Sequence, residues 1–227
     1  MTKQETAQAL LATEEIETRP NPSHSVIWMH GLGADGHDFV PVVGQLKLPP
    51  VGIRFVFPHA PMMPVTINGG FVMRAWYDIT VENLGLKEDA PGLRNSQSAI
   101  EQLIAREVQR GIPTSRIVLA GFSQGGAMAL QTGLRHAKKL AGILVLSGYL
   151  PLQSAFEKER NPANGLTAVF LGHGTLDPVV PMALAIASRA KLSQLGYPVE
   201  WHEYPMMHSV CEEEIADIGS WFEKVLL

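Results

Sequence analysis

One serine of this 227-residue chain stands in a pattern typical of a catalytic nucleophile. Ser123 is the centre of the sequence GFSQG at positions 121–125, and it follows the apolar run Arg116–Ala120. A stretch with helical character, Gln124–His136, comes directly after it. A serine on a tight strand-to-helix turn projects its hydroxyl above the edge of a sheet, and glycines on either side leave room for the turn. The pattern therefore predicts acyl transfer with Ser123 as the attacking group.

A serine nucleophile requires a histidine base and an acid that orients the base. In serine hydrolases with this kind of turn, the order along the chain is nucleophile, acid, histidine. Asp177 is the only aspartate between Ser123 and the last histidine, His208, and it follows the apolar run Ala168–Gly172. Order and location both predict Asp177 as the acid. The alternative is an ordinary turn residue, because Pro178 follows it.

Two histidines follow Asp177 in the chain, His202 and His208. His202 lies inside the alternating run Val199–Tyr204, so we expect it on one face of an edge strand. His208 lies between this run and the last helical segment, from which an imidazole can reach over the sheet edge. We therefore predict His208 as the base; the alternative is a loop residue beside a helix cap at Ser209.

The tetrahedral intermediate of acyl transfer needs hydrogen-bond donors for its oxyanion. The backbone N–H that follows the nucleophile belongs to Gln124 and is the first expected donor. The second is expected from the sequence HGLG at positions 30–33, where Leu32 lies between two glycines. We expect His30 to brace this loop without titrating during catalysis.

The elements that must position these residues alternate between short apolar runs and longer amphipathic stretches. This alternation predicts one α/β domain over residues 1–227, with a doubly wound, mostly parallel sheet and helices on both faces. Leu11–Arg19 is expected as a further edge strand or extension within residues 1–22. The predicted strands are Ser25–His30, Ile53–Phe57, Arg116–Ala120, Ala141–Ser147, Ala168–Gly172 and Val199–Tyr204, and the predicted helices are Asp38–Leu46, Gln97–Arg110, Gln124–His136, Ala183–Leu195 and Glu212–Val225.

The stretch His59–Leu93 interrupts the alternation and is rich in proline, glycine, methionine and aromatic residues. We expect an ordered excursion over the carboxyl edge of the sheet, where such folds bind ligands. Its large apolar residues are either core or contacts to an apolar part of a substrate. The substrate contacts expected near the site are Met73, Trp76, Val179 and Met207.

The composition excludes several other classes of protein. A net charge of −4 with scattered basic residues argues against a nucleic-acid partner. No apolar run is long enough to span a bilayer, and Met1–Pro20 lacks the features of a secretory signal. The single cysteine, Cys211, fits a reducing compartment, so we expect the cytosol.

Two further motifs do not predict a cofactor site. Residues 31–36 spell G-x-G-x-x-G after a strand, but the next strand ends at Phe57-Pro58 without the acidic residue of a dinucleotide site. No histidine spacing is typical of a metal site, because His24, His30 and His37 do not share a helix face. We therefore expect neither a metal nor an organic cofactor.

These motifs together resemble the phospholipase/carboxylesterase family of α/β hydrolases, which includes the acyl-protein thioesterases. The resemblance implies the α/β-hydrolase fold without a large cap domain, the Ser123–Asp177–His208 triad, and oxyanion donors at Leu32 and Gln124. The sequence at positions 65–70 resembles that of bacterial carboxylesterases more than that of eukaryotic depalmitoylating enzymes. The segments that carry the resemblance are residues 30–36, 57–61, 75–78, 121–126, 172–178 and 206–210.

The implied reaction is hydrolysis of short- to medium-chain carboxylic esters, and also of thioesters. Met207 is bulkier than the residue usual before the histidine, which leaves the preferred acyl length open. The alternatives are an acyl-protein thioesterase or lysophospholipase acting on long acyl chains, and a non-catalytic scaffold that binds an apolar ligand. The implied partner is a small or lipid-like ester, without integral membrane contact. Whether two chains form a homodimer is left open by the sequence.

Overall fold

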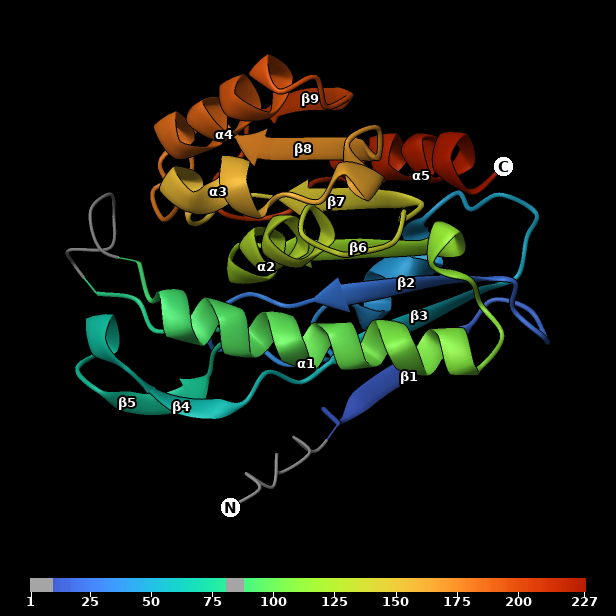
Figure 1. Ribbon diagram of the computed structural model, residues 1–227, viewed down its shortest axis with the longest axis horizontal. Helices are drawn as coiled ribbons and strands as arrows, with labels where there is room; N and C mark the ends of the chain where they lie inside the picture. Colours follow the sequence, from blue (N-terminus) through green and yellow to red (C-terminus); the bar gives the residue numbers. More distant parts are fainter. Residues whose placement is uncertain (1–9, 81–87) are drawn as a thin grey trace.

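A seven-stranded sheet forms the centre of the computed structural model, which describes residues 10–80 and 88–227 (Figure 1). The edge strand β1 runs antiparallel to β3, and all other neighbours in the sheet are parallel. In spatial order the strands are β1 (Thr13–Glu17), β3 (Ile53–Pro58), β2 (His24–Met29), β6 (Ile117–Phe122), β7 (Gly142–Leu146), β8 (Ala168–Gly174) and β9 (Val199–Tyr204).

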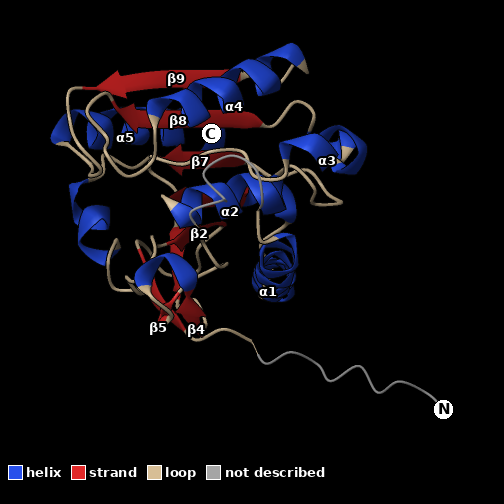
Figure 2. Cartoon of the chain, turned by 90° about the vertical axis from the view of Figure 1, so that its left-hand side faces the viewer, coloured by secondary structure: helices blue, strands red, loops and turns tan. Residues whose placement is uncertain are grey.

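Helices cover both faces of the sheet (Figure 2). One face carries α1 (Ala90–Gln109), α2 (Gln124–Gly133), α3 (Gln153–Glu159) and α4 (Met182–Gln194). The other face carries α5 (Glu212–Leu226) and the 3₁₀ helix η1 (Val40–Gln45). Further 3₁₀ turns are η2 (Thr66–Asn68), η4 (Thr114–Arg116) and η5 (Pro162–Asn164). No helix within the described ranges has the length and apolarity that crossing a membrane requires.

The sheet has a hydrophobic core on each face, because successive side chains along a strand point to opposite faces. In β2, Ile27 and Met29 join the core beneath α1 and α2, whereas Val26 and Trp28 join the core beneath α5. All six residues of β2 are buried, which explains why its last four, Val26–Met29, are continuously apolar in sequence. The predicted doubly wound α/β-hydrolase fold is therefore confirmed.

The structure corrects two predicted helices. Asp38–Leu46 forms only the 3₁₀ helix η1 (sequence VPVVGQ), because Gly44 and the β-branched valines beside it favour an α-helix poorly. The helix predicted at Gln97 begins at Ala90 instead. Its first turn holds Pro91, which is tolerated there, and the Asp89 side chain caps it by accepting a hydrogen bond from the Gly92 N–H at 3.0 Å.

Two elements were not predicted. The helix α3 is only seven residues long and lacks a strong apolar period. The segment His59–Leu93 contains the hairpin β4 (Met62–Val65) and β5 (Phe71–Arg74), followed after a gap by the start of α1. Residues 81–87 of that segment lie outside the described part of the chain. Between the strands of the main sheet, the described residues hold no larger insertion than this one.

Candidate active site

Ser123 lies on the turn between β6 and α2, in a backbone conformation that side-chain-bearing residues rarely adopt. Its φ is 56° and its ψ is −118°. Such strain persists only where the surroundings hold it, here through the Ser123 N–H, which donates to the Leu146 carbonyl at 2.8 Å. The turn therefore presents the Ser123 side chain at the carboxyl edge of the sheet, as its sequence pattern predicts.

The glycines around Ser123 are required by close backbone packing. A Cβ atom at Gly121 would lie 2.1 Å from the carbonyl carbon of Gly125. A Cβ atom at Gly125 would lie 2.1 Å from the backbone oxygen of Met29 in β2. Neither contact is sterically allowed, so α2 can start this close to the sheet only with glycine at both positions.

Asp177 and His208 form the hydrogen-bonded pair that a serine hydrolase needs. The His208 Nδ1 lies 2.7 Å from Asp177 Oδ2. The other carboxylate oxygen, Oδ1, accepts from the backbone N–H groups of Val179 at 2.8 Å and Val180 at 2.9 Å. This arrangement fixes the orientation of the carboxylate, and the carboxylate in turn orients the imidazole.

The same contacts determine the charge of Asp177. Burial by itself raises the pKa of this carboxyl, but hydrogen bonds from His208 and from the Val180 and Val179 N–H groups outweigh it. The resulting pKa is below the usual value, so Asp177 is ionised at neutral pH.

His208 lies close to the nucleophile turn. Its ring centroid is 4.6 Å from that of Phe122, the residue directly before Ser123. The other candidate, His202, lies in β9 and stacks on Phe170 with a centroid separation of 4.7 Å. The sequence-based choice between the two histidines thus agrees with their positions.

The loop after β2 presents Leu32 between Gly31 and Gly33. Gly33 has a φ of 78°, and its N–H donates to the Arg74 carbonyl at 2.9 Å. The N–H of Gln124, at the N-terminus of α2, has no partner within its own helix and is available to a ligand. Both predicted oxyanion donors belong to residues that line one cavity with Ser123.

His30 braces this loop in its neutral form. The Ala60 N–H donates to His30 Nε2 at 3.0 Å, so the ring proton is on Nδ1, which lies 2.7 Å from the Gly31 carbonyl. Burial lowers the pKa of His30 to about 4. The imidazole therefore stays uncharged at neutral pH and acts as a structural bridge.

The side chain of Gln124 has a role that the sequence did not reveal. Its Oε1 accepts from the Trp76 N–H at 3.0 Å, and its Nε2 donates to the Tyr77 carbonyl at 2.8 Å. The Trp76 indole N–H donates to the His30 carbonyl at 2.9 Å. These bonds tie the start of α2 to the chain after β5 and to the loop after β2, so the two N–H groups predicted as oxyanion donors are held relative to each other.

A cavity of about 400 Å³ opens at Ser123. Of the predicted site residues, Leu32, Ser123, Gln124 and Val179 line it. Glu88, Asp89 and Tyr149 were not predicted; each follows or precedes a regular element at the carboxyl edge of the sheet, which is the signal that could have found them. The remaining lining residues are Ile67, Asn68, Tyr77, Ile79, Pro178, Val180, Pro181 and Leu184.

The other three predicted substrate contacts do not line this cavity. Trp76 is buried beneath the loop after β2, where it bonds His30. Met73 receives a hydrogen bond from the side chain of Asn68, a lining residue, at 3.2 Å from its Sδ. Met207 is 63% exposed to solvent. Trp76 thus supports the loop after β2, Met73 contacts a residue that lines the cavity, and Met207 lies outside the cavity.

The wall formed by Glu88 and the two tyrosines is polar. Both Glu88 carboxylate oxygens accept from the Leu152 N–H, at 3.0 and 2.9 Å, and burial raises the pKa of Glu88. The hydroxyls of Tyr77 and Tyr149 are 3.0 Å apart. The cavity lining therefore combines these polar groups with apolar side chains such as Val179 and Leu184.

Comparisons with known proteins show what this chain is similar to. The family described as Phospholipase/Carboxylesterase matches residues 11–226. Acyl-protein thioesterase 1 of Neurospora crassa is 42% identical over 212 residues, which cover 89% of this chain and 86% of the relative. The crystal structure of Arabidopsis thaliana SOBER1 matches with a TM-score of 0.83 and 30% identity, covering 90% of this chain and 99% of that one. The structure of Zea mays acyl-protein thioesterase 2 matches with a TM-score of 0.80 and 26% identity, covering 94% and 99%.

Proposed function

The chain belongs to the phospholipase/carboxylesterase family of serine hydrolases, and we propose that it is a carboxylesterase whose acyl-enzyme forms on Ser123. The observation that carries the proposal is the 2.7 Å contact between His208 Nδ1 and Asp177 Oδ2, close to the turn that holds Ser123, a strained residue that lines the cavity. The proposed triad is Ser123, His208 and Asp177.

The proposed reaction has two halves. In the first, His208 Nε2 takes the Ser123 proton while Oγ attacks the ester carbonyl, and the Leu32 and Gln124 N–H groups stabilise the oxyanion. The C–O bond to the alcohol then breaks, and His208 returns its proton to the leaving oxygen. In the second half a water molecule, deprotonated by His208, attacks the acyl-enzyme; the bond to Ser123 Oγ then breaks, His208 returns the proton to Oγ, and the acid is released.

The proposed substrates are short- to medium-chain carboxylic esters, and also thioesters. The cavity volume of about 400 Å³ supports this range, because it is at the small end of ligand sites. An acyl-protein thioesterase or lysophospholipase acting on long acyl chains is the second candidate. The identity of 42% to a protein named acyl-protein thioesterase 1 favours that candidate. A cytosolic location and a homodimer stay predictions.

The proposal is tested with p-nitrophenyl esters from acetate to palmitate and with a thioester of each matched acyl chain. We expect Ser123→Ala to lose about a thousandfold or more in kcat/KM. The control is Ser220→Ala, on the exposed side of α5, which should retain the wild-type rate. Equal rates for wild type and Ser123→Ala would exclude the triad. An optimum at sixteen carbons, or a large preference for thioesters, would instead select the second candidate.

A further inference from the structure

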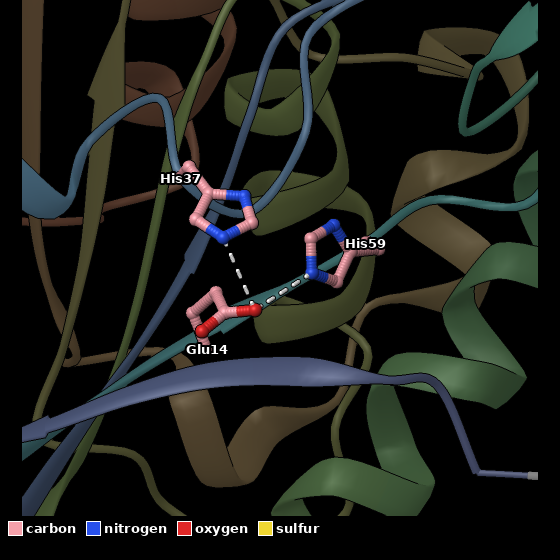
Figure 3. A group of neighbouring side chains, drawn as sticks. All are labelled: Glu14, His37 and His59. Atoms are coloured by element: carbon pink, nitrogen blue, oxygen red, sulfur yellow. Dashed lines mark hydrogen bonds and ion pairs between the residues drawn. The ribbon is translucent and has the colours of Figure 1, made fainter.

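Three side chains from separate segments converge beside β1 (Figure 3). Glu14 belongs to β1, His37 lies in the loop after β2, and His59 directly follows β3. Their nearest nitrogen and oxygen atoms all lie within 4.8 Å of one another. None of the three lines the cavity at Ser123. The sequence did not predict this group, because its members are far apart in the chain.

The two separations from the Glu14 carboxylate fit coordination better than hydrogen bonding. Glu14 Oε1 is 3.3 Å from His37 Nε2 and 3.4 Å from His59 Nε2. Hydrogen bonds between N–H and oxygen are typically 2.7–3.2 Å long. Two ligand atoms at about 2.1 Å from a tetrahedral zinc ion are about 3.4 Å apart, which is close to both observed values.

The environment of His37 also favours metal coordination. Asp35 Oδ1 lies 3.1 Å from His37 Nδ1 and also accepts from the His37 backbone N–H at 2.8 Å. A carboxylate on one ring nitrogen orients the other nitrogen of a metal-binding histidine. With its proton on Nδ1, a neutral His37 directs the lone pair of Nε2 toward the Glu14 carboxylate, and a cation between these two atoms removes the repulsion.

Metal coordination by His59 requires the loss of one hydrogen bond. The Gly36 N–H donates to His59 Nδ1 at 3.1 Å, so without a metal the ring proton is on Nε2, the atom that faces Glu14. Coordination through Nε2 moves this proton to Nδ1 and breaks the bond from Gly36. Metal binding is therefore coupled to a change of His59 tautomer and to a movement at Gly36.

We propose that Glu14, His37 and His59 bind a divalent transition-metal ion of the zinc type. Two imidazoles and one carboxylate are a ligand set of this class of ion, and they leave a fourth position for water. His37 and Glu14 are both exposed, so the ion can enter from solvent. A bound ion would link β1, the loop after β2 and the end of β3.

The test uses Zn²⁺ itself, in competition with a chromogenic chelator, on the full chain. We expect one Zn²⁺ per wild-type chain, and a loss of affinity of at least 10–100-fold in His37→Gln, since losing even an outer partner has that effect. Glu14→Gln is the second variant, also at an exposed position, and should lose affinity similarly. The matched control is His202→Gln, because His202 also lies between two carboxylates, Glu200 at 3.1 Å and Asp217 at 3.2 Å.

Nitrogen NMR of the His59 ring provides a readout that is independent of hydrolysis. Without metal, Nε2 should carry the proton; with Zn²⁺, the proton should be on Nδ1, and the Gly36 amide signal should shift. Absence of binding at micromolar Zn²⁺ would overturn the proposal. Unchanged affinity in both His37→Gln and Glu14→Gln would overturn it as well, since the ion would then be bound elsewhere, for instance by His208.

Discussion

At the scale of single residues, the proposed chemistry depends on the charge and orientation of one carboxylate. Asp177 accepts hydrogen bonds from two backbone N–H groups and from His208, which together hold its pKa below the usual value. An amide at this position keeps the shape but loses the negative charge and presents an N–H group toward Nδ1. It would therefore favour the imidazole tautomer that cannot accept the serine proton.

We expect Asp177→Asn to reduce kcat by about 10⁴-fold with little effect on KM, as in other serine hydrolases of this type. Steady-state hydrolysis of a short p-nitrophenyl ester measures the loss. The control is Asp217→Asn, because Asp217 also contacts a histidine Nδ1, that of His202, but far from the cavity. A kcat for Asp177→Asn within tenfold of the control's would exclude Asp177 as the acid.

At the scale of elements, contact with β2 limits which residues the first turn of α2 can contain. Because the backbone oxygen of Met29 occupies the position that a Cβ at Gly125 would need, any side chain there must push the helix off the sheet. The N–H of Gln124, one residue earlier, would move with it. Stability and oxyanion stabilisation are therefore coupled at this turn.

We expect Gly125→Ala to lower the free energy of unfolding by about 3 kcal/mol or more, at the upper end of overpacking effects. Urea denaturation followed by circular dichroism measures it. Gly44→Ala is the control, since a Cβ there meets no atom within 4 Å. That control should change stability by less than about 1 kcal/mol. Equal stability of the two variants would contradict the steric argument.

The first turn of α5 contains a buried acid that has no part in the proposed reaction. Glu214 packs against Gly172 of β8, where a Cβ would lie 2.3 Å from its Oε1. Burial and then the charge of Asp217 raise the pKa of Glu214 to about 8, from a usual value of 4.5. The carboxyl is thus protonated in the folded protein over a pH range in which the unfolded chain has released that proton.

This difference makes stability fall as pH rises. Between pH 4.5 and 8 the folded state binds more protons than the unfolded state, so the contribution of Glu214 is complete below 4.5 and lost toward 8. Relative to Glu214→Gln, we expect the wild type to lose about 1.4 kcal/mol of unfolding free energy per pH unit in this range. Urea denaturation at pH 5, 6 and 7 measures the difference. A difference that stays constant with pH would show that Glu214 is ionised when folded.

At the scale of the whole molecule, one buried carboxylate joins the edge of the sheet to the helix layer. Glu107 of α1 is buried and lies 2.9 Å from Arg54 Nη1 in β3 and 3.0 Å from Arg110 Nη1. Arg54 also contacts Glu17 in β1 at 2.9 Å. Removing Glu107 leaves the largely buried Arg54 with only a half-exposed partner.

We expect Glu107→Ala to cost about 3–5 kcal/mol of unfolding free energy, the range for breaking a buried ion pair. Glu17→Ala removes the exposed partner of the same arginine and should cost less than about 1 kcal/mol. Thermal and urea unfolding of both variants measure the contrast. If the two substitutions cost the same, the burial of Glu107 does not determine its contribution.

The sequence by itself determined the fold class and the order of the main elements. Continuous apolar runs predicted strands that are buried on both faces, such as Gly142–Leu146, because burial on both sides disfavours polar residues. It also singled out Ser123, Asp177 and His208, since a strand-to-helix turn and the carboxyl ends of parallel strands place side chains at one edge. Their catalytic roles remain a prediction, which the substitutions above test.

Only the tertiary structure decided which residues outside these patterns meet. The Gln124 side chain bonds the chain at Trp76 and Tyr77, about fifty residues away, and no local period reports such a contact. The same holds for Glu14, His37 and His59, which three different strands bring together. The physical reason is that hydrophobic periodicity and turn chemistry are local properties of the chain, whereas hydrogen-bond and metal-ligand geometry depends on how the packed sheet aligns its loops.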